Sequence, residues 1–407
     1  MYSQLFIEKV VNSQRDRLLK LERGMLRQVT GFEKLSTHAF IVSGVRRCGK
    51  STVLQQINFS SKESSIYLNF EDPRLAGFDL SDFNRLHEIA ERAGINRYFF
   101  DEIQLVEGWE NFVRFRLDEN YRVFISGSNA KILSKELGSK LTGRHITREL
   151  FPFSYQEYLT FTGKDGNEDS AGKYIENGGF PEYLKTELAD VLMQVFNDII
   201  SRDIILRYKI KNSTVIKQLA AWLISHVGKP FSGNSLKKMW QIGSSSSIME
   251  YLSYFEDTYL FFFISKFSYS LKVQLVNPRK IYCIDNGLIK ENSVCFTEDR
   301  GRLLENIVFL HLRRLTSEIF YFQDNHECDF VVFNSKKLTG LFQVSWKLDQ
   351  DNMDREISGL IEAMNYFNVD SGLIITMGQS DQFESEGKVI DVIPFHEWVL
   401  KKVENKA

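Results

Sequence analysis

The segment GVRRCGKS, from Gly44 to Ser51, constrains the fold of this chain more than any other stretch of its sequence. This segment matches the phosphate-binding loop, or P-loop, G-x-x-x-x-G-K-[ST] at every fixed position: two glycines, a lysine and a serine. An apolar segment, FIVS, precedes the loop, and a helical segment, TVLQQI, follows it. This order of strand, loop and helix predicts an α/β fold whose loop binds the phosphates of a nucleotide.

Each residue type in the loop has a chemical role. Gly44 and Gly49 allow backbone N–H groups to turn toward phosphate, and the positive end of the following helix points the same way. Lys50 is expected to contact the β- and γ-phosphates, and the Ser51 hydroxyl to bind Mg²⁺. The sequence therefore predicts ATP and Mg²⁺ as cofactors. The expected nucleotide-binding residues are Gly44, Val45, Arg46, Arg47, Cys48, Gly49, Lys50, Ser51 and Thr52.

The composition is that of an ordinary folded protein. The 407 residues are too many for one compact core, and they are 43% apolar and 26% charged. A formal charge of -2 gives no global field for nucleic acid or an anionic membrane. Since there is neither an apolar leader nor an uninterrupted apolar run of 18 residues, we expect a cytoplasmic protein without a membrane partner.

The cysteines indicate reduced thiols, because their spacing fits neither a zinc site nor a disulfide framework. One of them lies inside the P-loop, at a permissive position, where a small neutral filler is a simpler interpretation than a redox switch. The four cysteines are Cys48, Cys283, Cys295 and Cys328.

Apolar runs alternate with helical stretches after an amphipathic first segment of about 30 residues. This βα pattern predicts a parallel sheet with helices on both faces. The expected strands are Phe40–Ser43, Ser65–Phe70, Tyr98–Phe100, Val123–Ser126 and His145–Leu150.

The segment RYFFDEIQ supplies the acids that a P-loop requires. Its apolar residues form a strand about 50 residues after the loop, and Asp101 and Glu102 follow at the carboxyl end of that strand. This is a Walker B pattern. Asp101 is expected to hold Mg²⁺ through water, and Glu102 to orient or polarise the attacking water.

Two further residues are candidates for catalysis. The strand ending in ISGSNA offers Ser126, Ser128 or Asn129 to the γ-phosphate or the attacking water, and Asn129 is the preferred residue. The alternative is that Asn129 fills a turn or caps the expected helix AKILSKEL. Arg144, in LTGRHITREL, is placed to complete a neighbouring subunit's site, although a solvated or salt-bridged arginine is nearly as good an interpretation.

Seven segments in a fixed order resemble bacterial and archaeal AAA-type ATPases that carry a C-terminal domain of unknown function. The resemblance implies a sheet of order 5-1-4-3-2, Arg144 as an arginine finger, and a helical lid containing the sequence GGFP at residues 178–181. It also implies that Glu71 and Asp72 lie near the nucleotide. The segments are IVSGVRRCGKST, IYLNFEDPR, YFFDEIQ, ISGSNA, LTGR, PFSYQEYL and GGFPEYL.

The region after Thr214 has the element order of a winged helix. A helix with one apolar face is followed by a short helix near Leu236–Trp240, another ending near Thr258, and the β-rich LFFFISKF. No Lys or Arg occurs from Met239 to Ser265, which favours a protein-packing module over DNA binding. A DNA partner stays open because of the basic residues Lys237, Lys238, Lys272, Arg279 and Lys280.

The C-terminal segment resembles the PD-(D/E)xK nuclease fold. Glu305 falls in a helix, Asp329 at the start of a strand and Gln343 in the next strand, which are the metal-binding positions of that fold. Ser345 stands where the family has lysine, and Lys347 on the same strand face begins about two residues too far along. The resemblance therefore implies a degenerate, non-cleaving site at Glu305, Asp329, Gln343 and Ser345.

Together these features predict an ATPase that passes its conformational change to a winged helix and a restriction-endonuclease-like α/β domain. The partner acted on is a nucleic acid or a protein, and the chain could form a homo-oligomer. A nucleotide-gated switch with little hydrolysis and an ATP-dependent nuclease are the alternatives. The expected parts are an N-terminal helix at 1–30, the ATPase core at 31–160, a lid at 161–212, a winged helix at 213–290 and the nuclease-like domain at 291–407.

Overall fold

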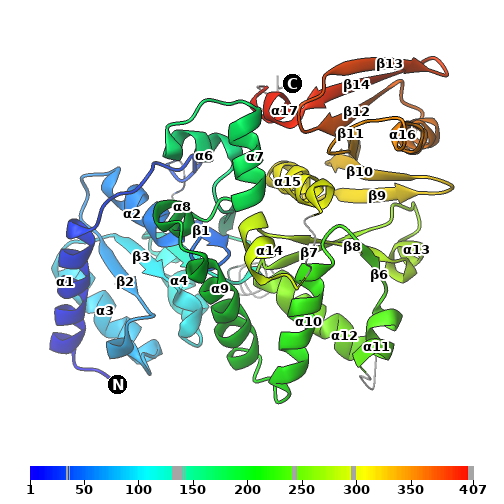
Figure 1. The fold of residues 1–407 in the computed structure, drawn as a ribbon. Helices are drawn as coiled ribbons and strands as arrows, with labels where there is room; N and C mark the ends of the chain where they lie inside the picture. The colour runs from blue at the N-terminus through cyan, green and yellow to red at the C-terminus, as the bar shows by residue number, and fades with distance from the viewer. Residues whose placement is uncertain are drawn as a thin grey trace. The chain divides into compact units, whose positions relative to one another are not determined.

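The computed structural model describes residues 1–33, 35, 37–130, 141, 143–240, 245–294 and 299–401. The chain divides into two compact units, which we call unit 1 and unit 2 (Figure 1). Unit 1 comprises Met1–Leu150 with Asp257–Tyr259, and unit 2 comprises Phe151–Glu256 with Leu260–Ala407. The expected helix AKILSKEL falls largely, and Cys295 entirely, outside the described residues.

Unit 1 is built on a parallel five-stranded sheet of order β2-β3-β4-β1-β5. This is the predicted order 5-1-4-3-2, which is thereby confirmed. Every residue of β1 and β3 is buried, because helices cover both faces of a parallel sheet. The strands are β1 (Ala39–Gly44), β2 (Ile66–Asn69), β3 (Arg97–Asp101), β4 (Arg122–Gly127) and β5 (His145–Leu150).

The helices of unit 1 pack around this sheet. The N-terminal helix α1 contacts β2 and α3, while α2 contacts β1, β3 and β4. Stacked and edge-on rings of Phe83, Phe100 and Phe112 fill the core beneath α3 and α4. These helices are α1 (Gln4–Lys20), α2 (Lys50–Phe59), α3 (Leu80–Arg92) and α4 (Trp109–Asp118), with 3₁₀ turns η1 (Pro73–Leu75) and η2 (Ile103–Leu105).

Unit 2 begins with a helical region. A capping box formed by Ser154 and Glu157 starts its first helix, and a second box formed by Asn167 and Ser170 starts the next. Its elements are α6 (Tyr155–Thr162), α7 (Glu168–Asn177), α8 (Pro181–Thr186), α9 (Ala189–Asp198), the π-helix η3 (Ile199–Leu206) and α10 (Ser213–Ser225).

A small antiparallel sheet of order β6-β8-β7 follows, together with three helices. Its central strand, β8, pairs with both neighbours and is buried from Lys280 to Cys283. The elements are β6 (Pro230–Phe231), α11 (Gly233–Trp240), α12 (Ser245–Asp257), β7 (Phe261–Ser265), α13 (Leu271–Val276) and β8 (Arg279–Cys283).

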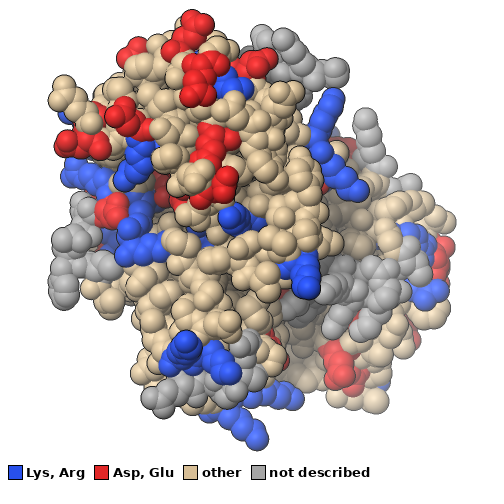
Figure 2. Space-filling model, turned by 90° about the vertical axis from the view of Figure 1, so that its right-hand side faces the viewer, with Lys and Arg blue, Asp and Glu red and all other residues tan. Residues whose placement is uncertain are grey.

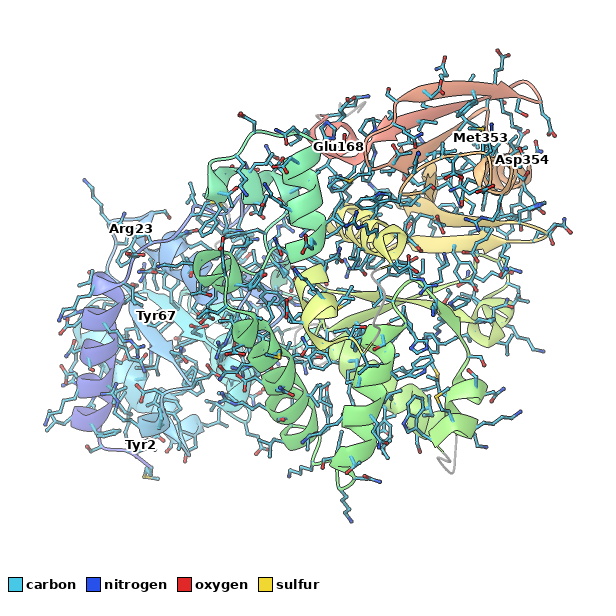
Figure 3. The ribbon with its side chains drawn as sticks, in the orientation of Figure 1. Tyr2, Arg23, Tyr67, Glu168, Met353 and Asp354 are labelled. Atoms are coloured by element: carbon cyan, nitrogen blue, oxygen red, sulfur yellow. The ribbon has the colours of Figure 1, made fainter. Side chains whose placement is uncertain are left out.

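The last part of unit 2 is a mixed six-stranded sheet of order β13-β14-β12-β11-β10-β9. Strands β9, β10 and β11 are antiparallel neighbours, whereas β11 and β12 are parallel, with α16 as the crossover between them. Figure 3 labels Met353 and Asp354 at the start of α16. The elements are α14 (Asn286–Asn292), α15 (Arg300–Leu315), β9 (Ile319–Gln323), β10 (Glu327–Asn334), β11 (Lys337–Val344), α16 (Met353–Phe367), β12 (Ser371–Thr376), β13 (Asp381–Ser385), β14 (Lys388–Pro394) and α17 (Phe395–Leu400).

The GGFP sequence is held by a buried carboxyl group of unit 2. The backbone N–H of Gly179 donates to Asp285 Oδ2 at 2.6 Å, and that of Gly287 donates to Oδ1 at 2.9 Å. A Cβ on Gly178 would lie 2.1 Å from Asp285 Oδ1, so only glycine fits there. Burial raises the pKa of Asp285 to about 7, although the Gly179 hydrogen bond opposes this shift.

This pKa gives a testable pH dependence of the stability of unit 2. The folded chain keeps a proton on Asp285 up to about pH 7, whereas an ordinary aspartate releases it near 3.8, so the free energy of unfolding falls as pH rises through this interval. The loss is on the order of 4 kcal/mol at most. We expect Asp285→Asn to flatten this fall, as measured by urea unfolding between pH 4.5 and 7.5. The exposed control Asp351→Asn should keep the wild-type slope, and an unchanged slope in Asp285→Asn would contradict the assignment.

Candidate functional site

The P-loop joins the end of β1 to the start of α2 and requires glycine at two positions. A Cβ on Gly44 would lie 2.1 Å from the carbonyl oxygen of Leu150 in the neighbouring strand β5. Gly49 caps α2 with φ of 104°, a left-handed conformation that favours glycine. The loop thus aims the N-terminus of α2 at the carboxyl-end edge of the sheet, where an anion is favoured.

Lys50 lies across this loop. Its Nζ donates to the carbonyl oxygens of Gly44 and Val45, both at 3.0 Å, and stands 3.6 Å from Glu102 Oε1. Only 4% of its side chain is exposed. An ammonium held at the loop by carbonyl oxygens can exchange those acceptors for phosphate oxygens without a large movement.

Asp101 is buried at the carboxyl end of β3, where four groups surround its carboxylate. Tyr67, labelled in Figure 3, donates its hydroxyl to Asp101 Oδ2 at 2.8 Å, and Ser126 Oγ donates to Oδ1. The Ser51 hydroxyl also hydrogen-bonds this carboxylate. Burial raises the pKa of Asp101, and the neighbouring Glu102 raises it further. Ser51 and Asp101, the two predicted metal residues, therefore lie together and present the oxygen donors that Mg²⁺ prefers.

Glu102 follows Asp101 in a left-handed conformation, with φ of 53°. Its backbone N–H donates to Ser126 Oγ at 3.2 Å, and Gln104 Nε2 donates to its Oε2. Both carboxylate oxygens of Glu102 therefore have a neighbouring donor, Lys50 at Oε1 and Gln104 at Oε2. This side chain is thus fixed at the same edge of the sheet as the P-loop.

The loop interior supports the structural interpretation of Cys48. Its side chain is fully buried, and Sγ donates to the carbonyl oxygen of Leu150 at 3.3 Å. Burial raises the thiol pKa, which works against thiolate formation and redox reactivity.

Two arginines contact other parts of the loop region: Arg27 donates to the Cys48 carbonyl at 3.1 Å, and Arg46 pairs with Glu71 at 3.0 Å. The Arg46–Glu71 pair brings Glu71 to the loop, and its proximity to a nucleotide stays a prediction.

The other two predicted catalytic residues lie at different ends of the sheet. Asn129 follows β4 and is 1% exposed, at the same edge as Asp101. Arg144 precedes β5 and pairs with Asp118 at 2.7 Å. In the β1–β5 register Ala39 faces His145 and Gly44 faces Leu150, so Arg144 is separated from its own P-loop by roughly 15–20 Å of strand.

Four residues near this site were missed by sequence reasoning. Tyr67 and Asn69 alternate on β2, so a period of two could have placed both beside Asp101. Gln104 reaches Glu102 only because a 3₁₀ turn follows β3, and Arg27 reaches Cys48 from an irregular segment. Neither of these last two contacts has a sequence signal.

In unit 2 the predicted nuclease-like residues gather at a cavity of about 900 Å³. Gln343 accepts the backbone N–H of Asp329 at 3.1 Å, and its amide donates to Glu356 at 2.5 Å. Ser345 donates to the carbonyl oxygen of Lys347 at 2.9 Å. The cavity is lined by Glu305, Asp329, Gln343, Ser345 and Lys347, among others.

The structure changes the expected role of Lys280. The sequence counted Lys280 among basic residues available to DNA, but its side chain is 2% exposed and pairs with Glu305, Glu327 and Asp329. It cannot contact a phosphate backbone from there.

On the face shown in Figure 2, Lys and Arg lie in several separate groups, and Asp and Glu gather near the top.

The described part of the chain has neither a membrane-spanning helix nor a preformed metal cluster. Among its helices, none is both long and apolar enough to cross a lipid bilayer. Among its His, Cys, Asp and Glu side chains, no group of three or more is arranged to hold a metal ion.

Comparison with known proteins gives matches over most of the chain. A family described as an AAA domain matches residues 36–159, and a family described as a domain of unknown function matches residues 168–294. The uncharacterized protein MJ1544 of Methanocaldococcus jannaschii is 34% identical over 392 residues, which cover 88% of each chain. An uncharacterized protein of Haemophilus influenzae is 28% identical over 383 residues, covering 89% of this chain and 94% of its own. The solved RuvB Holliday junction branch migration motor of Thermotoga maritima covers 64% of this chain and 89% of its own, with 12% identity and a TM-score of only 0.28.

The parallel sheet, the P-loop and the matched AAA domain define unit 1 as an AAA-type P-loop ATPase domain. More narrowly, the chain belongs to the family of the archaeal protein MJ1544. The match to a domain of unknown function falls on residues 168–294, almost entirely before the nuclease-like domain expected at 291–407, which stays a prediction.

Proposed function

We propose that unit 1 binds ATP with Mg²⁺ on the loop Gly44–Thr52 and hydrolyses it, and that unit 2 uses the resulting change to act on a nucleic acid or protein partner. The observation that carries this proposal is the gathering of Lys50, Ser51, Asp101 and Glu102 at one edge of the sheet. Each of the four has the chemistry that phosphoryl transfer to water requires.

In this proposal the residues divide the work. Lys50 exchanges its two carbonyl partners for phosphate oxygens and offsets their charge. Ser51 and Asp101 hold Mg²⁺, which when bound would neutralise charge on the phosphates. Glu102, held by Gln104, orients the attacking water, and Asn129 contributes a polar group beside it.

The architecture of unit 2 supports the finer assignments. The order helix, strand, helix, helix, strand, helix, strand over α10 to β8, with the sheet β6-β8-β7, supports a winged helix that carries the short extra helix α13 between its last two strands. The order α15-β9-β10-β11-α16-β12, with the cavity residues on α15, β10 and β11, supports a nuclease-like domain. We propose both as modules that receive the change from unit 1.

The proposal is tested by phosphate release from purified protein with Mg²⁺ and ATP, alone and with DNA, RNA or candidate proteins. We expect a basal Mg²⁺-dependent rate that the correct class of partner raises. Tight ATP binding without phosphate release under any of these conditions would instead identify a nucleotide-gated switch.

Arg144 is proposed to act on a neighbouring copy of the chain, because it lies at the opposite strand end from its own P-loop. If so, the ATPase rate per subunit rises with protein concentration, and Arg144→Ala lowers the rate at high concentration by about 10³-fold or more. Steady-state rates over a concentration series measure both effects. Asp118→Asn, which frees Arg144 from its salt bridge, is the matched control and should keep the rate. A concentration-independent rate would contradict the role in trans.

A further inference from the structure

Three carboxylates that line the cavity of unit 2 pair with a buried lysine from outside the nuclease-like elements. Lys280 lies on β8, the central strand of the three-stranded sheet, and its side chain crosses to α15 and β10. Its Nζ stands 2.6 Å from Glu327 Oε1, 2.9 Å from Asp329 Oδ1 and 3.1 Å from Glu305 Oε1. One ammonium therefore contacts all three carboxylates.

The nuclease-like arrangement implies a divalent metal at Glu305 and Asp329, and the residues present do not fit one. A metal ion needs these oxygens at about 2.0–2.6 Å from its own centre, and the ammonium of Lys280 already occupies the point on which they converge. Two cations in one desolvated place would repel each other. Gln343, the remaining predicted ligand, is engaged by the Asp329 N–H and by Glu356.

The surrounding groups keep Lys280 charged and in place. Oxygens of Glu327, Asp329 and Glu305 all lie within 3.1 Å of the Lys280 Nζ. Tyr282, two residues along β8, donates to Glu305 Oε1 at 2.7 Å and so fixes the same carboxylate oxygen. A charged amine held by three acids, with 2% of its side chain exposed, is not displaced without opening the cluster.

We infer that the ammonium of Lys280 takes the place of the divalent metal that the nuclease-like arrangement implies. Unit 2 then carries this cation as part of its own chain and engages its partner without metal. The presence of Lys280 then explains two features together: no lysine is needed at position 345, and no space is left for a metal ion between Glu305 and Asp329. Ser345 donates to the Lys347 carbonyl, and the cation that contacts Glu305 and Asp329 comes from β8 instead. This inference goes beyond ATP hydrolysis, and it is tested without nucleotide.

The test is a titration of the full-length, nucleotide-free protein with Mn²⁺. The concentration of free Mn²⁺ is measured by electron paramagnetic resonance, and the difference from the total gives the bound ion. Wild type and Asp329→Asn should bind Mn²⁺ equally, because the cluster around Lys280 has no metal site for the substitution to remove. Lys280→Met, which leaves three carboxylates without their cation, should gain one Mn²⁺ site per chain that wild type lacks, with an affinity at least about 10-fold above any Mn²⁺ binding by wild type. Adding Asp329→Asn to Lys280→Met should abolish the gained site, and Lys347→Met, at an exposed lysine of the same cavity, should behave as wild type.

Thermal unfolding in the same titration covers the case in which Lys280→Met is unstable. Mn²⁺ should raise the melting temperature of Lys280→Met and leave that of wild type unchanged, because only the variant has room for the ion. Metal binding by wild type that Asp329→Asn removes would overturn the inference. So would a folded Lys280→Met that gains no site, or metal-dependent nucleic-acid cleavage lost in both Lys280→Met and Asp329→Asn. Loss of ATP hydrolysis would not affect this result, so the two proposals fail separately.

Discussion

Glu102→Gln is expected to bind ATP as tightly as wild type and to hydrolyse it about 10²–10⁴-fold more slowly. The amide keeps the size of the side chain, but it cannot accept a proton from the attacking water or attract it as a carboxylate does. Lys50 also loses a charged neighbour at 3.6 Å, which leaves its two carbonyl contacts in place. Equilibrium titration with ATP and steady-state phosphate release, measured on one preparation, separate the two quantities.

The matched control for this change is Glu107→Gln, an exposed glutamate five residues further along. It should leave binding and turnover at wild-type values. A Glu102→Gln variant that turns over ATP at more than about a tenth of the wild-type rate would assign the water-orienting role to another residue, since general-base catalysis contributes at least about 10².

Lys50→Ala is expected to weaken ATP binding by roughly 1.5–3 kcal/mol, or roughly 10- to 150-fold in Kd, and to abolish measurable hydrolysis. The lost ammonium is 4% exposed and contacts both carbonyls of the loop, so no solvent cation can replace it in the same position. Isothermal titration with ATP and Mg²⁺ measures the loss.

The exposed lysine Lys62 provides the control, because Lys62→Ala removes the same charge from unit 1 away from the loop. Circular dichroism should show that both variants are folded. Unchanged ATP affinity in a folded Lys50→Ala would contradict the position that we propose for the phosphates.

The fold of unit 1 could be predicted because four of its five strands, β1 to β4, are mainly apolar runs that are mostly buried, and a P-loop fixes where the first of them ends. The strand His145–Leu150 was predicted to the residue, whereas β1 and β3 extend one residue further at each end. Hydrogen bonding of the sheet extends strands beyond their apolar residues, as at Arg97, whose guanidinium lies over the rings of Phe99 and Phe124.

The candidate sites could be predicted only where spacing carries the information. The loop and the Asp101–Glu102 pair follow directly from local patterns. Contacts between distant segments do not: Tyr67 approaches Asp101 across a strand pair, and Lys280 reaches Asp329 from 49 residues away. Sequence alone made Lys280 a solvent-exposed base, because nothing in the local pattern near residue 280 marks a buried cation.

The central claim is that unit 1 binds ATP and hydrolyses it with the residues at the P-loop edge of the sheet. Its most direct test is the rate of phosphate release from purified wild-type protein with ATP, with and without Mg²⁺, beside Glu102→Gln under identical conditions. We predict steady release by wild type that requires Mg²⁺ and that falls at least about 100-fold in the variant. Release that is equal in both proteins, or absent from wild type at millimolar ATP with every class of partner, would contradict it.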